Sequence, residues 1–117
     1  MASDAPLTVA QVVERLGLEV CAAEEGLAAE VTGAVVSDLL SYVMAHGRRG
    51  FVWVTIQTHA NIVAVAALGG LAAIVLADGS EPGEDTAVRA EEEGILLLRA
   101  ADASYAVAGK LWELGVR

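Results

Sequence analysis

The chain has 117 residues, of which 56% are apolar, and a formal net charge of −9. This apolar content is sufficient for residues 1–117 to fold as one domain without a metal or a disulfide, and Cys21, the only cysteine, cannot form an internal disulfide. The negative charge argues against nucleic acid as a partner, because a polyanion is bound through clustered Lys and Arg, and the lone cysteine fits a reducing, cytoplasmic location.

The first predicted elements are a helix and two strands. Thr8 and Gln11 have the spacing of a capping box, and apolar residues then recur at helical intervals until Gly17. We therefore expect a helix over 9–16. Residues 18–36 predict a strand, an acidic turn that contains glycine, and a second strand rich in β-branched residues.

A second short helix is predicted to follow these strands. Ser37 or Asp38 can cap its start, and Gly47 can end it. One side of this helix is apolar, which indicates that it packs on a core; the residues are Leu39, Leu40, Val43 and Met44.

The stretch 51–77 contains no charged residue and is longer than the ~20 residues that a membrane-spanning helix needs. Gln57, His59 and Asn61 interrupt it, and in lipid they would require partners or lose several kcal/mol each. Two glycines break it again at 69–70. We therefore expect no membrane span, but a strand covered on both faces (51–56), a helix (61–68), a turn and a buried strand (71–77).

The remaining residues continue the alternation of strand and helix. A loop over 78–85 leads to a helix over 86–93 and a buried strand over 95–100, and Asp102 or Ser104 can cap a final helix that extends to about residue 114. This alternation is typical of parallel βαβ crossovers. The predicted fold class is α/β, with a mostly parallel sheet between two helical layers.

Polar side chains follow each predicted parallel strand, where open α/β sheets bind ligands. Each residue taken alone is also a common helix cap or turn residue. The group as a whole is our candidate ligand site, with His59 as its most informative member because histidine titrates near neutral pH. The candidate residues are Ser37, Asp38, Thr55, Gln57, Thr58, His59, Asn61, Asp78, Gly79, Ser80, Asp102 and Ser104.

Sequence motifs of catalysis are absent. The chain has no phosphate-binding loop of the G-x-x-x-x-G-K-[ST] type, no G-x-S-x-G, no H-E-x-x-H and no paired cysteines for zinc. We therefore expect a protein that is not an enzyme and that carries no metal and no cofactor. The enzymatic alternative uses His59 as a base, oriented by Asp38 or Asp78.

Four segments together resemble the DRTGG domain family: VTGAVVSDLLSYVM, VWVTIQTHANIVAVAAL, LAAIVLADGSEP and AEEEGILLLRAADASYAVAGKL. Residues 7–38 are similar to the amino-terminal module of HPr kinase/phosphorylase. The resemblance implies an α/β/α fold like that of the amino-terminal domains of certain Mur ligases. It also implies a domain that is usually dimeric and serves as a regulatory or ligand-sensing module. The kinase domain of HPr kinase has no counterpart here.

Most of the residues that give this family its name are replaced in this chain. The Asp-Arg pair falls on Thr58 and His59, and the Thr-Gly-Gly segment falls on Ala77, Asp78 and Gly79, of which only Gly79 is retained. His59 can partly replace the arginine as a phosphate contact.

Two functions remain open from the sequence. The first is a regulatory module that binds a small phosphate-bearing or nucleotide-like ligand at the strand ends and acts as a homodimer. The alternative is an assembly protein for a partner enzyme, with no small ligand. Its anchors would be aromatic residues that can equally belong to the core, namely Tyr42, Phe51, Trp53 and Trp112.

Overall fold

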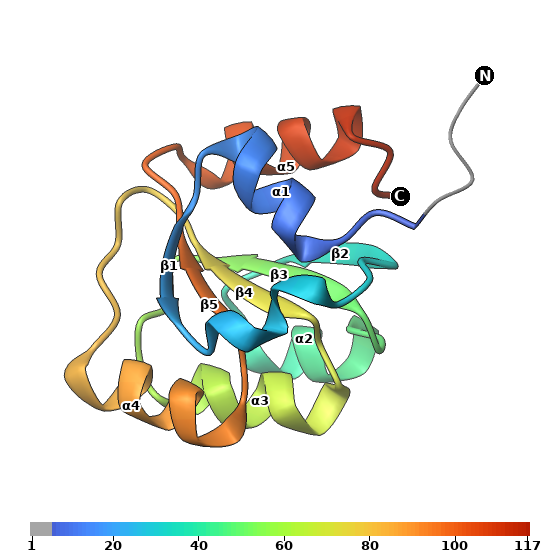
Figure 1. Cartoon of the computed structure of the whole chain (residues 1–117). Coiled ribbons are helices and arrows are strands. Elements are labelled where there is room, and N and C mark those ends of the chain that lie inside the picture. The colour runs from blue at the N-terminus through green and yellow to red at the C-terminus, as the bar shows by residue number, and fades with distance from the viewer. Residues whose placement is uncertain (1–5) are drawn as a thin grey trace.

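A five-stranded sheet lies between two layers of helices in the computed structural model, which describes residues 6–117 (Figure 1). The strands are β1 (Glu19–Ala22), β2 (Gly33–Val36), β3 (Phe51–Thr55), β4 (Ala73–Leu76) and β5 (Leu97–Arg99). The α-helices are α1 (Val9–Leu16), α2 (Leu40–His46), α3 (Asn61–Gly69), α4 (Glu84–Glu93) and α5 (Ser104–Glu113). A short 3-10 helix, η1 (Glu24–Ala28), replaces the predicted acidic turn.

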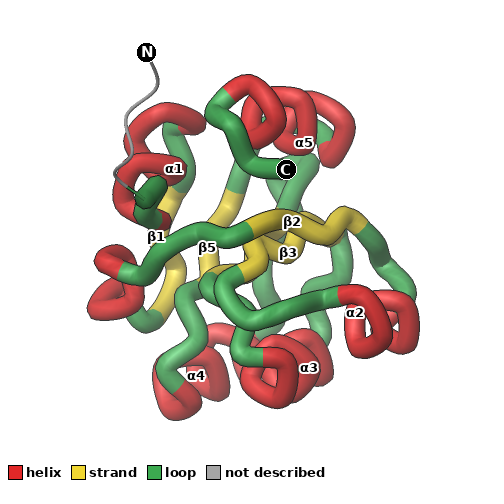
Figure 2. The backbone as a smooth tube through the Cα atoms, turned by 90° about the vertical axis from the view of Figure 1, so that its right-hand side faces the viewer, coloured by secondary structure: helices red, strands yellow, loops and turns green. Residues whose placement is uncertain are grey.

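The strand order is β1-β5-β4-β3-β2. Strands β2 to β5 are parallel, and β1 runs antiparallel to β5 at one edge of the sheet. Helices α1 and α5 cover one face, and α2, α3 and α4 cover the other, as the view along the layers in Figure 2 shows. The predicted three-layer α/β/α fold with a mostly parallel sheet is confirmed.

The central strands are buried on both faces, and their side chains alternate between two cores. Val52 and Val54 of β3 belong to the core under α1 and α5, whereas Trp53 between them points into the core over α2, α3 and α4. Strand β4 alternates in the same way, with Val75 on the first side and Ile74 on the second. This period of two is the geometry of a pleated strand and explains the continuous apolar runs in the sequence.

The aromatic residues divide between the core and the surface. Trp53 is fully buried and donates a hydrogen bond from Nε1 to the carbonyl oxygen of Ser37, at 2.8 Å. Phe51 is half-buried, whereas Tyr42 and Trp112 are exposed. Trp53 is therefore a core residue, whereas Tyr42 and Trp112 are surface residues.

The uncharged stretch of the sequence folds as a strand, a nine-residue helix and a second strand: β3, α3 and β4. Gly70 ends α3 in the left-handed conformation, with φ of 66°. Among residues 6–117, no helix is long and apolar enough to cross a membrane.

Local signals for helix ends hold for α1 and fail for two other helices. Thr8 and Gln11 form the predicted capping box. Helix α2 instead starts after Leu39 and α5 after Ala103, and neither N-terminus has a side-chain cap. The predicted caps Ser37 or Asp38, and Asp102 or Ser104, are wrong, because other groups occupy the two carboxylates: Thr55 and Ile56 donate to Asp38, and Lys110 pairs with Asp102.

The predicted apolar side of the second helix is only partly buried. Val43 is buried and Leu40 half-buried, but Leu39 and Met44 are 63% and 58% exposed. Helix α4 also differs from its prediction, because it begins at Glu84 and not at Thr86. Thr86 is thereby placed inside the first turn, where it is buried.

Candidate functional site

The carboxyl ends of β2, β3, β4 and β5 lie at the same edge of the sheet, because these strands are parallel. Strand β1 is antiparallel to β5 and starts at that edge, with Glu19 opposite Arg99. Thr55 is the last residue of β3, and the other candidate residues lie in the loops that leave this edge or in the first turn of the helix that follows. The structure divides them into separate groups, which are described in turn from β2 to β5.

Asp38, Thr55 and Gln57 connect the loop after β2 to the end of β3. One carboxylate oxygen of Asp38 accepts hydrogen bonds from Thr55 Oγ1, at 2.7 Å, and from the N–H of Ile56, at 2.9 Å. Gln57 donates from Nε2 to the Asp38 carbonyl oxygen, and its N–H donates to Thr55 Oγ1. Ser37 accepts from the N–H of Leu39. The polar atoms of this group largely bond one another, which holds the two loops together.

Thr58 and His59 lie in an open hollow at the centre of the edge. The hollow has a volume of about 370 Å³ and is lined by the loop before α3 (Thr58, His59, Ala60) and by the start of α4 (residues 83–86). The carbonyl oxygen of Thr58 accepts from Thr86 Oγ1, at 2.6 Å, and from the N–H of Gly83. These bonds position the N-termini of two helices around one space.

His59 is oriented by the helix that follows it. The N–H of Asn61 donates to His59 Nδ1 at 3.3 Å, so that in this arrangement Nδ1 carries no hydrogen and Nε2 is the atom able to donate. The His59 side chain is exposed beside the start of α3. The next two N–H groups of this helix bond the turn before it, since Ile62 donates to the carbonyl oxygen of His59 and Val63 to that of Ala60. Asn61 is the first residue of α3 and contributes its backbone to this arrangement.

Asp78, Gly79 and Ser80 form the turn after β4. Asp78 and Gly79 both have left-handed backbones, with φ of 62° and 65°. The N–H of Asp78 donates to the carbonyl oxygen of Asp102, and the N–H of Gly79 donates to that of Ala100. Because these two N–H groups bond the neighbouring loop, the turn does not present them to a ligand.

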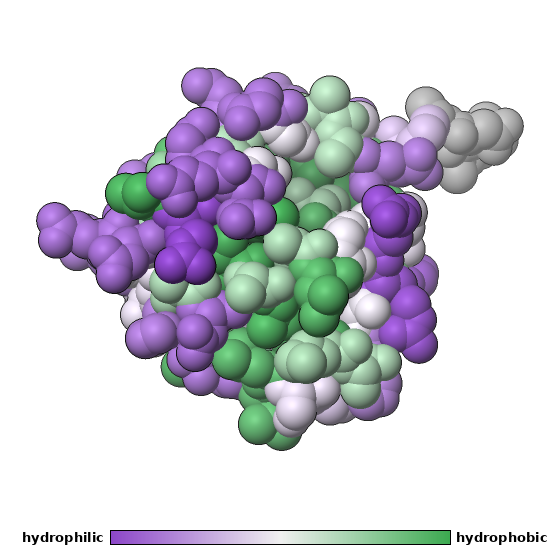
Figure 3. Space-filling view, turned by 90° about the horizontal axis from the view of Figure 1, so that it is seen from below, coloured by the Kyte–Doolittle hydropathy of each residue, from purple (hydrophilic) through white to green (hydrophobic). Residues whose placement is uncertain are grey.

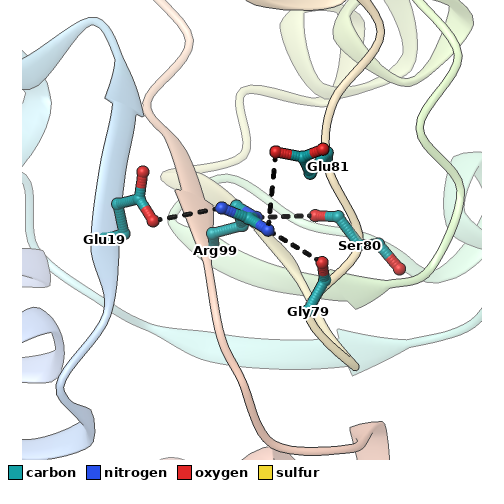
Figure 4. A network of polar contacts seen from close by, with 5 residues as sticks. All are labelled: Glu19, Gly79, Ser80, Glu81 and Arg99. Atoms are coloured by element: carbon teal, nitrogen blue, oxygen red, sulfur yellow. Dashed lines mark hydrogen bonds and ion pairs between the residues drawn. The ribbon is translucent and has the colours of Figure 1, made fainter.

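Arg99 at the end of β5 fills the space between β1 and this turn (Figure 4). Its guanidinium donates to the carbonyl oxygens of Gly79, at 2.9 Å, and of Ser80, at 3.1 Å. It also pairs with the carboxylate of Glu19 at 3.2 Å and, more distantly, with that of Glu81 at 3.8 Å. The Arg99 side chain is 26% exposed, so it is partly withdrawn from water and stabilises the turn.

The last two candidates belong to the loop after β5. Asp102 forms an ion pair with Lys110 of α5, with 2.6 Å between carboxylate and ammonium. Ser104 is the first residue of α5 and is half-buried. The hollow beside this pair contains Asp102 and Lys110 but neither Thr58 nor His59, so the structure does not gather all the candidates around one cavity.

Sequence reasoning did not identify Arg99, nor the start of α4 as the opposite wall of the hollow. Arg99 carries a usable signal, because it is the only charged residue in the otherwise apolar segment 95–100. No such signal marks the start of α4, because the sequence predicts a loop that includes Glu84 and Asp85 and a solvent-facing helix that begins at Thr86. Their contribution depends on the tertiary contact with Thr58.

Cys21 lies near the Arg99 group and has no features of a nucleophile. Burial of its thiol raises the pKa above the ordinary value of 9.0, the Glu19 carboxylate raises it further, and the Arg99 guanidinium opposes both effects. The thiol therefore stays protonated near neutral pH, and a protonated thiol is a poor nucleophile. Within the described chain, no three His, Cys, Asp or Glu side chains are placed to share a metal ion.

No family model matches this chain, and no curated protein matches its sequence. A solved structure with the same fold contains the CBS and DRTGG domains of the regulatory region of Clostridium perfringens pyrophosphatase, complexed with the activator diadenosine tetraphosphate. The two structures agree with a TM-score of 0.69 at 14% sequence identity. The match covers 86% of this chain and 44% of that one. The chain therefore has a fold that occurs in a DRTGG-containing regulatory region, and it spans less than half of that structure.

Proposed function

We propose that this chain is a non-catalytic regulatory module of the DRTGG type. It forms one domain over 1–117, binds a small nucleotide-like or phosphate-bearing ligand at the carboxyl ends of its parallel strands, and acts as a homodimer in the cytoplasm. The hollow between Thr58–Ala60 and the start of α4 is the observation that carries the ligand proposal. The structural match to a regulatory region crystallised with a dinucleotide activator supports it.

The chemistry of the hollow suits a ligand with two different ends. At the start of α3, the positive end of the helix dipole and the His59 Nε2 favour a phosphate group. On the opposite wall, Glu84 and Asp85 present carboxylates in the first turn of α4. Carboxylates accept hydrogen bonds from ribose hydroxyls, as they do in dinucleotide-binding folds. A nucleotide satisfies both walls, whereas a ligand that is only phosphate is repelled by the second.

Titration calorimetry with AMP, ATP and diadenosine tetraphosphate tests this proposal. Nucleotide binding is expected to weaken about tenfold in His59→Ala, which corresponds to about 1.4 kcal/mol. His46→Ala is the matched control, because His46 is the other histidine and its ring stacks on Tyr42 in α2. Inorganic phosphate is expected to bind more weakly than AMP. Absence of heat with every nucleotide, or equal loss of affinity in the two variants, contradicts the proposal.

A second function, assembly with a partner enzyme without any small ligand, is favoured by the apolar surface. Nine large hydrophobic side chains are exposed in the described chain, among them Leu68, Tyr105 and Trp112. If nucleotide titration shows no binding, affinity purification of partners with this chain as bait distinguishes the two functions. A stable partner recovered in stoichiometric amount, from a protein that binds no nucleotide, supports assembly.

A further inference from the structure

Helix α3 is apolar on its outer face as well as on its inner one. It lies in the middle of the lower helical layer, between α2 and α4, in both ribbon views (Figures 1 and 2). Its sequence NIVAVAALG contains no charged residue, and Ile62, Val63 and Ala66 form its buried side. Leu68 is nevertheless 79% exposed. Surface helices ordinarily present polar residues to water, so this face requires an explanation.

The space-filling view of this side shows an apolar band across the middle of the face, with hydrophilic residues beside it (Figure 3). A groove of about 390 Å³ runs between α3 and α4 on this side. Four of its lining residues belong to α3 and two, Arg89 and Glu93, to α4. Neither Arg89 nor Glu93 has an ion-pair partner within the described residues. The groove therefore combines an apolar wall with one positive and one negative charge.

The two charges are arranged to complement a second copy of the same groove. Arg89 and Glu93 are four positions apart and lie about one turn from each other along α4. Helices α3 and α4 run in the same direction, because each connects two neighbouring parallel strands. Consider a two-fold axis that lies in the interface, perpendicular to both helices. This axis places α4 against α4 of a second copy, and α3 against α3, each pair antiparallel. Arg89 then faces Glu93 of the second copy, and the reverse contact follows by symmetry.

The same axis matches the apolar side chains of α3 by size. Ala64 and Leu68 are also four positions apart and line the same groove. Rotation therefore places the exposed Leu68 against Ala64 of the second copy, a large side chain against a small one. The absence of charge on α3 lets two acidic chains approach along this helix, although each carries a net charge of −9.

We infer that the α3–α4 face joins two copies of this chain about a two-fold axis, with Arg89 paired to Glu93 across the interface. This inference specifies the dimer contained in the proposed function and rests on that part of it. It makes no use of the nucleotide hollow, which shares no lining residue with this groove.

Sedimentation velocity of the whole chain and of charge-exchanged variants tests the interface. The wild type is expected to sediment as a dimer. Arg89→Glu and Glu93→Arg each place like charges across the axis, so each is expected to raise the dimer dissociation constant by about tenfold or more. An equimolar mixture of the two variants is expected to recover dimers, because every contact in the mixed dimer joins opposite charges. The double exchange Arg89→Glu/Glu93→Arg is expected to recover the homodimer.

The apolar contact is tested separately. Leu68→Glu is expected to give a folded monomer, whereas Tyr105→Glu is the control, since Tyr105 is 91% exposed on α5 in the opposite helical layer. Circular dichroism verifies that both variants are folded. A wild-type dimer that is insensitive to the charge exchanges and to Leu68→Glu overturns this interface alone. A monomeric wild type overturns the interface and the dimeric part of the proposed function, and nucleotide titration still decides the ligand part.

Discussion

Two kinds of region along the same sheet edge use their polar residues in opposite ways. Around Arg99, and around Asp38 with Thr55, side chains and backbone carbonyls are bonded to one another. Around Thr58 and His59, backbone bonds position the walls of an open hollow. Polar residues at the ends of parallel strands therefore do not all bind ligands. In this fold some of them connect neighbouring loops, and others stay available to contact a ligand.

The largest loss of stability is expected when Arg99 is changed. Arg99→Ala leaves two carbonyl oxygens and the Glu19 carboxylate without their donor, and hydrogen bonds to a charged group are worth about 1.5–3 kcal/mol. We expect the free energy of unfolding in urea to fall by about 2 kcal/mol. Arg15→Ala, which changes an exposed arginine in the last turn of α1, serves as the control. Equal losses in both variants show that the Arg99 group is not structural.

A smaller loss is expected in the group around Asp38. Thr55→Val keeps the shape of a buried side chain but removes its donor to Asp38 and its acceptor for the Gln57 N–H. The expected cost is about 1–2 kcal/mol in the same urea experiment. Thr58→Val is the matched change in the open hollow and is expected to alter stability by less than about 0.5 kcal/mol. Reversal of this order contradicts the contrast between the two regions.

For substitutions in the turn after β4 we expect the free energy of unfolding to change by about 1 kcal/mol, since a left-handed backbone costs an ordinary residue about 1–2 kcal/mol. Asp tolerates the left-handed conformation better than Ala does, so we expect Asp78→Ala to lower stability. Asp78→Gly is expected to be at least as stable as the wild type, because glycine adopts positive φ without strain. Thermal denaturation of both variants is the measurement. A less stable Asp78→Gly disproves the backbone explanation.

The smallest effect concerns the Cys21 thiol beside the Arg99 group. Its pKa is raised by burial and then by Glu19, and lowered by Arg99. Alkylation measured against pH is therefore expected to have its midpoint above 9.0, to move down in Glu19→Gln and to move up in Arg99→Ala. Because the folded pKa is the higher one, Cys21 contributes stability below pH 9.0 that decreases as the pH rises through the folded pKa. Shifts in the same direction in both variants refute this assignment.

The fold was largely predictable because its signals are local. The capping box at Thr8, the apolar runs of β3 and β4 and the left-handed glycines after helices all depend on residues within a few positions. The helix caps predicted at Asp38 and Asp102 failed for the opposite reason. Thr55 lies 17 positions from Asp38, and Lys110 lies 8 positions from Asp102, and in each case the distant partner took the carboxylate.

The candidate site shows the same limit. That the candidate residues share one edge of the sheet was predictable, because parallel strands bring their carboxyl ends together there. The site's division into bonded groups and an open hollow was not, since that depends on the contact of Thr86 with Thr58 and on the reach of Arg99 to the turn at Gly79. Which of these residues bind a ligand stays a prediction that the nucleotide titration tests.

The antiparallel pairing of β1 with β5 also has a consequence for the order of folding. Glu19 and Arg99 are 80 positions apart, whereas the parallel strands are connected by short crossovers. Closing a longer loop costs more chain entropy, so the parallel strands can assemble before β1 joins them. On a ribosome, β1 is synthesised first but has no partner until β5 has emerged. Once β5 has emerged, its outer edge can pair with strands of other chains until β1 docks and covers it.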